Sequence, residues 1–158
     1  LNKCQKTIGK AAAAFLAAKT KALAKCWDAV NKGTFPGPCP LPGDGKAAAA
    51  IAAAEAKKIA AICKACGGAD QGCDQTVTAP TTTVPGTGGS DDLTPAVIGF
   101  APNCDALTIP GGPSCSQPIS TLADIVECVD CITEFKVDCA DRLAVLWAVS
   151  YPGECNPG

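Results

Sequence analysis

Two related alanine-rich stretches decide the fold. Residues 9–27 read GKAAAAFLAAKTKALAKCW, and residues 45–63 read GKAAAAIAAAEAKKIAAIC, so the second stretch repeats the first in degenerate form. Alanine has the highest helix propensity of all residues, and larger apolar side chains recur in both stretches at helical spacing. Both stretches are therefore predicted to be amphipathic helices.

The first helix is predicted over residues 4–31 and the second over residues 45–66; Gly33 ends the first, and Gly67-Gly68 ends the second. Apolar residues on one face of each helix should form a core, and lysines occupy the opposite face. The predicted core residues are Ile8, Phe15, Leu16, Leu23, Trp27, Val30, Ile51, Ile59 and Ile62. The lysines are Lys3, Lys6, Lys10, Lys21, Lys25, Lys32, Lys46, Lys57 and Lys64. Two repeats are too few for a solenoid, so we expect an antiparallel helical hairpin.

The composition changes after residue 75. Residues 76–95 are rich in Thr, Gly and Pro and are predicted to be a linker or long loop, which could carry O-linked sugar. Short β-prone runs at 96–100 and 106–110 predict a small hairpin or a pair of extended segments. A third helix is predicted from about residue 120 to 149, with a break near Asp141. Its apolar face holds Leu122, Ile125, Val126, Val129, Ile132 and Leu143, and an adjacent arc holds Asp124, Glu127, Asp130, Glu134, Asp138 and Asp141.

These patterns predict a mainly α, disulfide-rich fold. It comprises an Ala/Lys-rich antiparallel helical hairpin (1–75), a Thr/Gly/Pro-rich loop (76–95), and short β segments with an acidic C-terminal helix (96–158). We expect the last part to pack on the hairpin, so that the chain forms one domain.

Twelve cysteines in 158 residues indicate a disulfide framework and an extracellular or cell-surface location, as for a mature secreted protein. We predict that all twelve are paired: Cys4, Cys26, Cys39, Cys63, Cys66, Cys73, Cys104, Cys115, Cys128, Cys131, Cys139 and Cys155. Chain geometry favours Cys26 with Cys39 and Cys104 with Cys115. Cys4 should pair with Cys66 or Cys73, and Cys155 should fix the tail to the body.

Histidine is absent, which excludes Ser-His and Cys-His hydrolysis and His-ligated metal sites. The pairs Cys63/Cys66 and Cys128/Cys131 could form a Cys4 zinc or rubredoxin-like site or a redox motif, but structural disulfides account for all twelve cysteines. We therefore expect neither an enzyme nor a cofactor or metal. No stretch of 18 apolar residues occurs, so no membrane span is expected.

The segments CKACGGADQGCD (63–74), IVECVDCITEFKVDCADRLAV (125–145) and YPGECNPG (151–158) resemble cysteine-rich secreted bacterial proteins of unassigned function. The resemblance implies a secreted setting and transfers no catalytic or binding residues.

The two halves of the chain carry opposite charge. Residues 1–75 hold eleven lysines and five acids, a net charge of +6, whereas residues 76–158 hold two basic residues and ten acids, a net charge of −8. The charged stripes could be solvated helix faces, could join the acidic helix to the hairpin within one molecule, or could join copies head to tail. Lysines without arginine or interleaved aromatics argue against a nucleic-acid partner.

The favoured function is a secreted structural subunit that assembles head to tail into an extracellular filament or surface layer. The alternative is a monomeric, disulfide-stabilised secreted binding module. Candidate assembly contacts are Lys21, Lys25, Lys32, Glu127, Asp130 and Glu134, with the β-prone segments 76–83 and 96–100 as further candidates.

Overall fold

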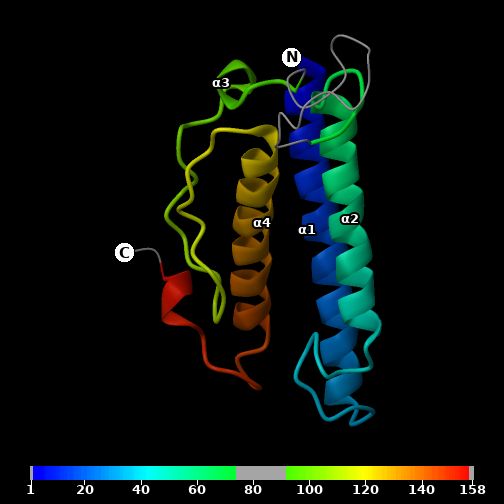
Figure 1. The fold of residues 1–158 in the computed structure, drawn as a ribbon. Helices are drawn as coiled ribbons and strands as arrows, with labels where there is room; N and C mark the ends of the chain where they lie inside the picture. The colour runs from blue at the N-terminus through cyan, green and yellow to red at the C-terminus, as the bar shows by residue number, and fades with distance from the viewer. Residues whose placement is uncertain (1, 74–91, 157–158) are drawn as a thin grey trace.

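The computed structural model describes residues 2–73 and 92–156 and contains three long helices (Figure 1). Helices α1 (Asn2–Asn31) and α2 (Lys46–Cys66) run side by side in opposite directions. Alanine methyl groups along both helices allow the backbones to approach closely. Disulfides join the two helices at one end, Cys4 to Cys66, and join α1 to its following loop at the other, Cys26 to Cys39. Both pairings agree with the sequence prediction.

Helix α4 (Leu122–Ala144) packs mainly against α1, and less against α2. A capping box starts it: the Thr121 hydroxyl accepts from the Asp124 N–H, and the Asp124 carboxylate accepts from the Thr121 N–H at 2.8 Å. Burial acts to raise the pKa of Asp124, but hydrogen bonds from Ser120 and Thr121 overcome this and lower it. The helix is unbroken at Asp141 and ends at Ala144, before the predicted limit of 149.

The β-prone run at 96–100 does not form a strand. Residues Pro95–Ile98 form the short helix α3, because a proline at the first helical position and Gly99 after the last one favour a helical turn. Gln5 of α1 donates a hydrogen bond to the Ile98 carbonyl at 2.6 Å and so holds α3 against α1. The run at 106–110 contributes one isolated bridge, Thr108 to Ser114.

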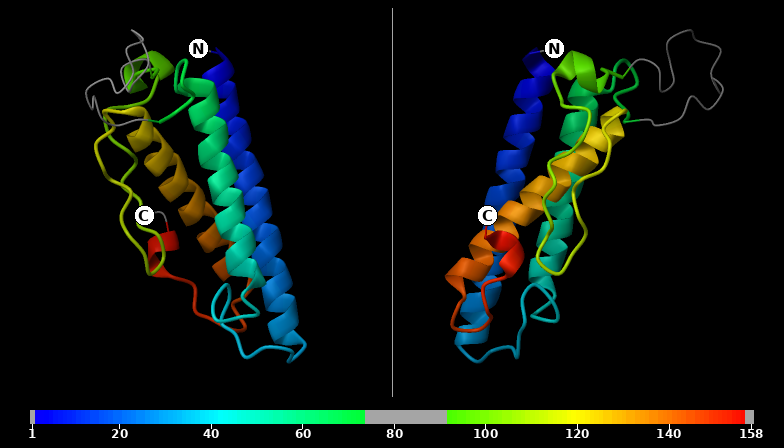
Figure 2. Two further views of the ribbon diagram at one scale, coloured as in Figure 1. Left: turned by 45° about the vertical axis from the view of Figure 1, so that its right-hand side comes forward. Right: turned by 90° about the vertical axis from the view of Figure 1, so that its left-hand side faces the viewer.

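The segment between α3 and α4 lies beside α4 in Figure 1 and crosses in front of it in the right-hand view of Figure 2. Disulfides join it to α4 twice, Cys104 to Cys128 and Cys115 to Cys131, so the predicted Cys104–Cys115 pair is wrong. Cys128 and Cys131 are three positions apart and so lie on one face of α4, where each bonds to a different part of the facing loop.

Two further disulfides fix loops at the helix ends. Cys139 joins Cys155 in the 3-10 helix η1 (Gly153–Cys155), which confirms that the tail is held to the body. Cys63 joins Cys73 across the turn that follows α2. This turn requires glycine at residue 67, because a Cβ there would lie 1.6 Å from the Gly72 carbonyl oxygen. All twelve cysteines are thus paired.

The buried residues form two clusters. One lies around the Cys4–Cys66 end of the helices and includes Ile62 and Ile125, while the other lies at the opposite end and includes Leu23 and Trp27. Trp27 is 6 % exposed and Leu23 is 2 % exposed, as the helical phase predicted. Two residues assigned to apolar faces differ: Ile59 is 36 % exposed and Leu143 is 59 % exposed. Val137 and Val145, before and after Leu143 in sequence, are both buried, so Leu143 lies on a side of α4 that faces away from the core.

None of the helices in the described part of the chain combines the length and apolar character needed to cross a membrane. Most of the predicted Thr/Gly/Pro-rich loop, including the segment 76–83 and the candidate positions for O-linked sugar, lies outside the described residues.

Candidate functional site

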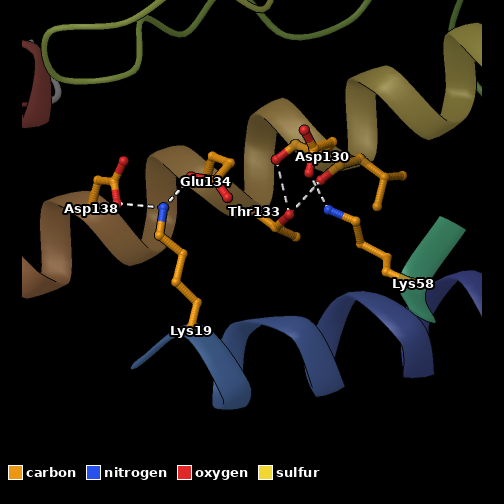
Figure 3. Close-up of polar contacts among 7 residues, drawn as sticks. Lys19, Lys58, Asp130, Thr133, Glu134 and Asp138 are labelled. Carbon is orange, nitrogen blue, oxygen red and sulfur yellow. Dashed lines mark hydrogen bonds and ion pairs between the residues drawn. The ribbon is translucent and has the colours of Figure 1, made fainter. Parts of the chain in front are cut away.

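Two buried lysines join the hairpin to the acidic helix (Figure 3). Lys58 of α2 is completely buried; its ammonium pairs with Asp130 and lies 3.8 Å from the centroid of the Phe15 ring. Lys19 of α1 is 5 % exposed and pairs with Glu134 and, at 2.6 Å, with Asp138. The acidic arc of α4 therefore contacts the hairpin within one molecule.

Burial raises the pKa of Glu134, and the hydrogen bond and positive charge of Lys19 only partly oppose that rise. Thr133 lies between the two ion-paired sites, and its hydroxyl donates to the Val129 and Asp130 carbonyls of its own helix. The carboxylates of Asp130, Glu134 and Asp138 are held by Lys58 and Lys19 between packed helices. The arrangement is suited to joining helices and offers no free acid–base pair.

The predicted assembly contacts separate into two groups. Lys21, Lys25 and Lys32 are exposed on α1 and just beyond it, and Glu127 is exposed on α4. Asp130 and Glu134 are instead used inside the molecule, where they neutralise Lys58 and Lys19. The structure thus leaves one of the three acidic candidates available to a neighbouring molecule without breaking an internal ion pair.

Sequence reasoning missed Lys19 and Lys58, although a signal for both is present. Lys19 lies four residues after Phe15 and four before Leu23, and Lys58 lies four residues before Ile62. Each lysine therefore interrupts an apolar stripe. Asp130, Glu134 and Asp138 recur every four residues on the partner helix, which is the pattern needed to meet two such lysines along one face.

A cleft opens between α1 and α4 near the second core cluster. Its volume is about 310 Å³, and most of its wall is apolar, including Trp27, Val137, Val145 and Trp147. The two tryptophan rings meet edge to face, with centroids 6.1 Å apart and an angle of 79° between their planes. Trp147 is 61 % exposed, so its ring forms an open wall of the cleft.

Two carboxylates lie at the cleft. The indole N–H of Trp27 donates to Asp141 at 2.9 Å, and burial raises the pKa of Asp141 although this hydrogen bond opposes the rise. Asp28 lies across the cleft and pairs with Lys32 at 2.6 Å, where both side chains are largely exposed. The cleft lining contains no lysine or arginine. The cleft can therefore accept an apolar group, and the Asp141 carboxylate at its wall favours a positively charged one.

The chain matches no protein-family model, no curated protein and no solved structure. The resemblance to cysteine-rich secreted bacterial proteins therefore stays an expectation from sequence, and the function has to be argued from the geometry.

Proposed function

We propose that this chain is an extracellular binding module that accepts an apolar cationic group, such as a quaternary ammonium, in the cleft lined by Trp27 and Trp147. The observation that carries the proposal is the open tryptophan wall beside the Asp141 carboxylate, in a lining that contains no lysine or arginine. A cation over an indole face is attracted by the electrons of the ring, and more strongly where water is partly excluded. Six disulfides provide the rigid frame that such a preformed cleft requires, and they suit an oxidising location.

Binding is favoured over catalysis because of where the acids lie. Asp130, Glu134 and Asp138 are held by lysines between helices, so they are poorly placed to act on a substrate. Asp141 is the one carboxylate in the cleft that is hydrogen-bonded to its wall, and no nucleophilic side chain accompanies it in the lining apart from the Thr20 hydroxyl.

Fluorescence titration tests the proposal. Benzyltrimethylammonium should quench or shift tryptophan emission, and its neutral isostere, neopentylbenzene, should bind several-fold more weakly. Trp147→Ala should abolish the difference between the two, whereas Trp147→Phe should retain part of it, because a phenyl ring still presents an aromatic face. Equal binding of the two compounds, or binding unaffected by Trp147→Ala, would contradict the proposal.

A self-assembling structural subunit is the second candidate. It is favoured by three exposed apolar side chains at the C-terminal end of α4 and just beyond it: Leu143, Leu146 and Trp147, which are 59 %, 55 % and 61 % exposed. Exposed apolar side chains that gather in one patch can mark a contact between copies. Sedimentation of the oxidised protein at micromolar concentration separates the two functions: a filament subunit should sediment far above 15.7 kDa, and Leu146→Asp should return it to the monomer.

A further inference from the structure

The outer surface of the hairpin carries a positive charge that the overall composition conceals. The chain as a whole has a formal net charge of −2, but α4 neutralises only the two buried lysines of the hairpin. The other nine lysines of residues 1–75 are all exposed. Among the described residues, Lys32 is the one of these nine that forms an ion pair, and its partner is the exposed Asp28.

A groove runs along the seam between α1 and α2 through this positive surface. Its first part has a volume of about 410 Å³, is floored by alanines such as Ala14, Ala18 and Ala54, and has Lys57 in its wall. The second part, of about 230 Å³, shares Ala50 with the first and has Lys25 and Lys46 in its wall. All lining residues of both parts come from α1, α2 and the loop before α2, and none from α4.

The groove is long enough for an extended polymer. On α1 its lining extends from Ala11 to Cys26, which corresponds to about 22 Å at a rise of 1.5 Å per residue. One acid, Asp44, lies in the lining, where it accepts a hydrogen bond from the backbone N–H of Lys46. Lys10 and Lys21 lie one helical turn from Ala14 and Ala18, so further ammonium groups border the groove.

We propose that this lysine-lined groove binds an acidic polysaccharide, that is, a chain of sugar rings carrying carboxylates or sulfates. Lysine pairs at i,i+4, such as Lys21 and Lys25, repel each other and destabilise a helix, so a polyanion along the groove relieves an unfavourable arrangement. Ammonium groups on flexible stems follow negative charges of variable spacing, whereas the bidentate recognition of arginine is not needed. The alanine floor offers methyl groups to the apolar C–H faces of sugar rings.

Nucleic acid fits this surface less well. Single strands bind chiefly by stacking bases on aromatic side chains, with a positive groove along the backbone. The one aromatic residue in the lining, Phe15, is 1 % exposed and is covered by the Lys58 ammonium. The groove therefore supplies charge and a flat apolar floor but no platform for bases.

Titration of the full oxidised chain with polygalacturonate, followed by calorimetry, tests the proposal. Binding should weaken steeply with added salt, because counterions screen the ammonium groups, and bound polymer should raise the melting temperature. Neutral dextran should not bind. The variant Lys25→Ala/Lys46→Ala/Lys57→Ala should lose at least tenfold in affinity.

The matched control removes three cations elsewhere, Lys32→Ala/Lys136→Ala/Arg142→Ala, and so has the same net charge. This control should bind polygalacturonate with native affinity. Trp147→Ala should do so as well, so that failure of the groove proposal can be distinguished from failure of the cleft proposal. The proposal is overturned if polygalacturonate does not bind, if the control loses as much affinity as the groove variant, or if single-stranded DNA binds more tightly than polygalacturonate at equal charge concentration.

Discussion

The ion pair between Lys58 and Asp130 should be energetically asymmetric. The Lys58 side chain is 0 % exposed, whereas that of Asp130 is 30 % exposed. If Asp130 loses its charge, the Lys58 ammonium stays buried without a counterion. If Lys58 is replaced instead, the remaining carboxylate can still reach water. Asp130→Asn should therefore destabilise the protein far more than Lys58→Met does.

Removing one partner of a buried ion pair costs about 3–5 kcal/mol. Asparagine keeps a carbonyl that can accept from Lys58, so about 3 kcal/mol, the lower end, is expected for Asp130→Asn. Methionine keeps most of the apolar stem that packs on Phe15 and leaves a carboxylate that can hydrate, so Lys58→Met should cost about 1 kcal/mol, the scale of an exposed pair. Replacing both residues, Lys58→Met with Asp130→Leu, should recover most of the loss.

Thermal unfolding followed by circular dichroism, with all disulfides intact, measures these differences. A loss of about 3 kcal/mol should lower the melting temperature by about 6–12 °C for a chain of this size. Lys64→Met, on the exposed face of α2, is the matched control and should change stability by less than about 0.5 kcal/mol. The reasoning is refuted if Lys58→Met is as destabilising as Asp130→Asn, because packing of the lysine on Phe15 would then outweigh its charge.

Four further outcomes are expected. Trp27→Ala should cost about 3–5 kcal/mol in denaturant unfolding, because Trp27 is buried. Trp147→Ala should cost about 0.5 kcal/mol or less, because its ring is largely exposed. Removing the terminal disulfide, Cys139→Ala with Cys155→Ala, should cost about 3 kcal/mol, since it closes a loop of 16 residues; a loss below about 1 kcal/mol would show that the tail is held by other contacts. The pKa of Glu134 is raised in the folded state. Relative to Glu134→Gln, the native chain should therefore lose stability as the pH rises from the usual pKa of 4.5 to the raised pKa of the folded state. A loss of stability as the pH falls through that interval would show that the pKa is lowered instead.

The long helices follow from the sequence because their determinants are local. Alanine propensity, apolar spacing and the terminal glycines place α1 and α2 within two residues of their observed bounds. The Thr121–Asp124 capping box gives α4 an equally local start. The same periodicity predicts which lysines are exposed, so the residues of the charged surface along the groove could be predicted from the sequence.

The remaining features depend on contacts between distant segments. Cys104 and Cys115 are neighbours in sequence, but their pairing is decided by the face of α4 that presents Cys128 and Cys131 to the loop. The cleft forms because the turn after α4 brings Trp147 to Trp27, which is 120 residues earlier in the chain. Periodicity within one helix contains no information on either contact.

The buried lysines explain why net charge is a poor guide to the partners of this chain. Among the acids that the structure describes in residues 92–156, several are engaged in hydrogen bonds or ion pairs with this chain's own side chains or backbone, including Asp124, Asp130, Glu134, Asp138 and Asp141. Only two of the eleven hairpin lysines are neutralised in the interior. Many of the acids in residues 76–158 therefore stabilise the fold through internal contacts, whereas most of the lysines in residues 1–75 are exposed at the surface. Although the sequence pI is about 5.0, lysines are exposed to solvent along the seam of the hairpin, and this local positive charge attracts a polyanion despite the negative net charge of the chain.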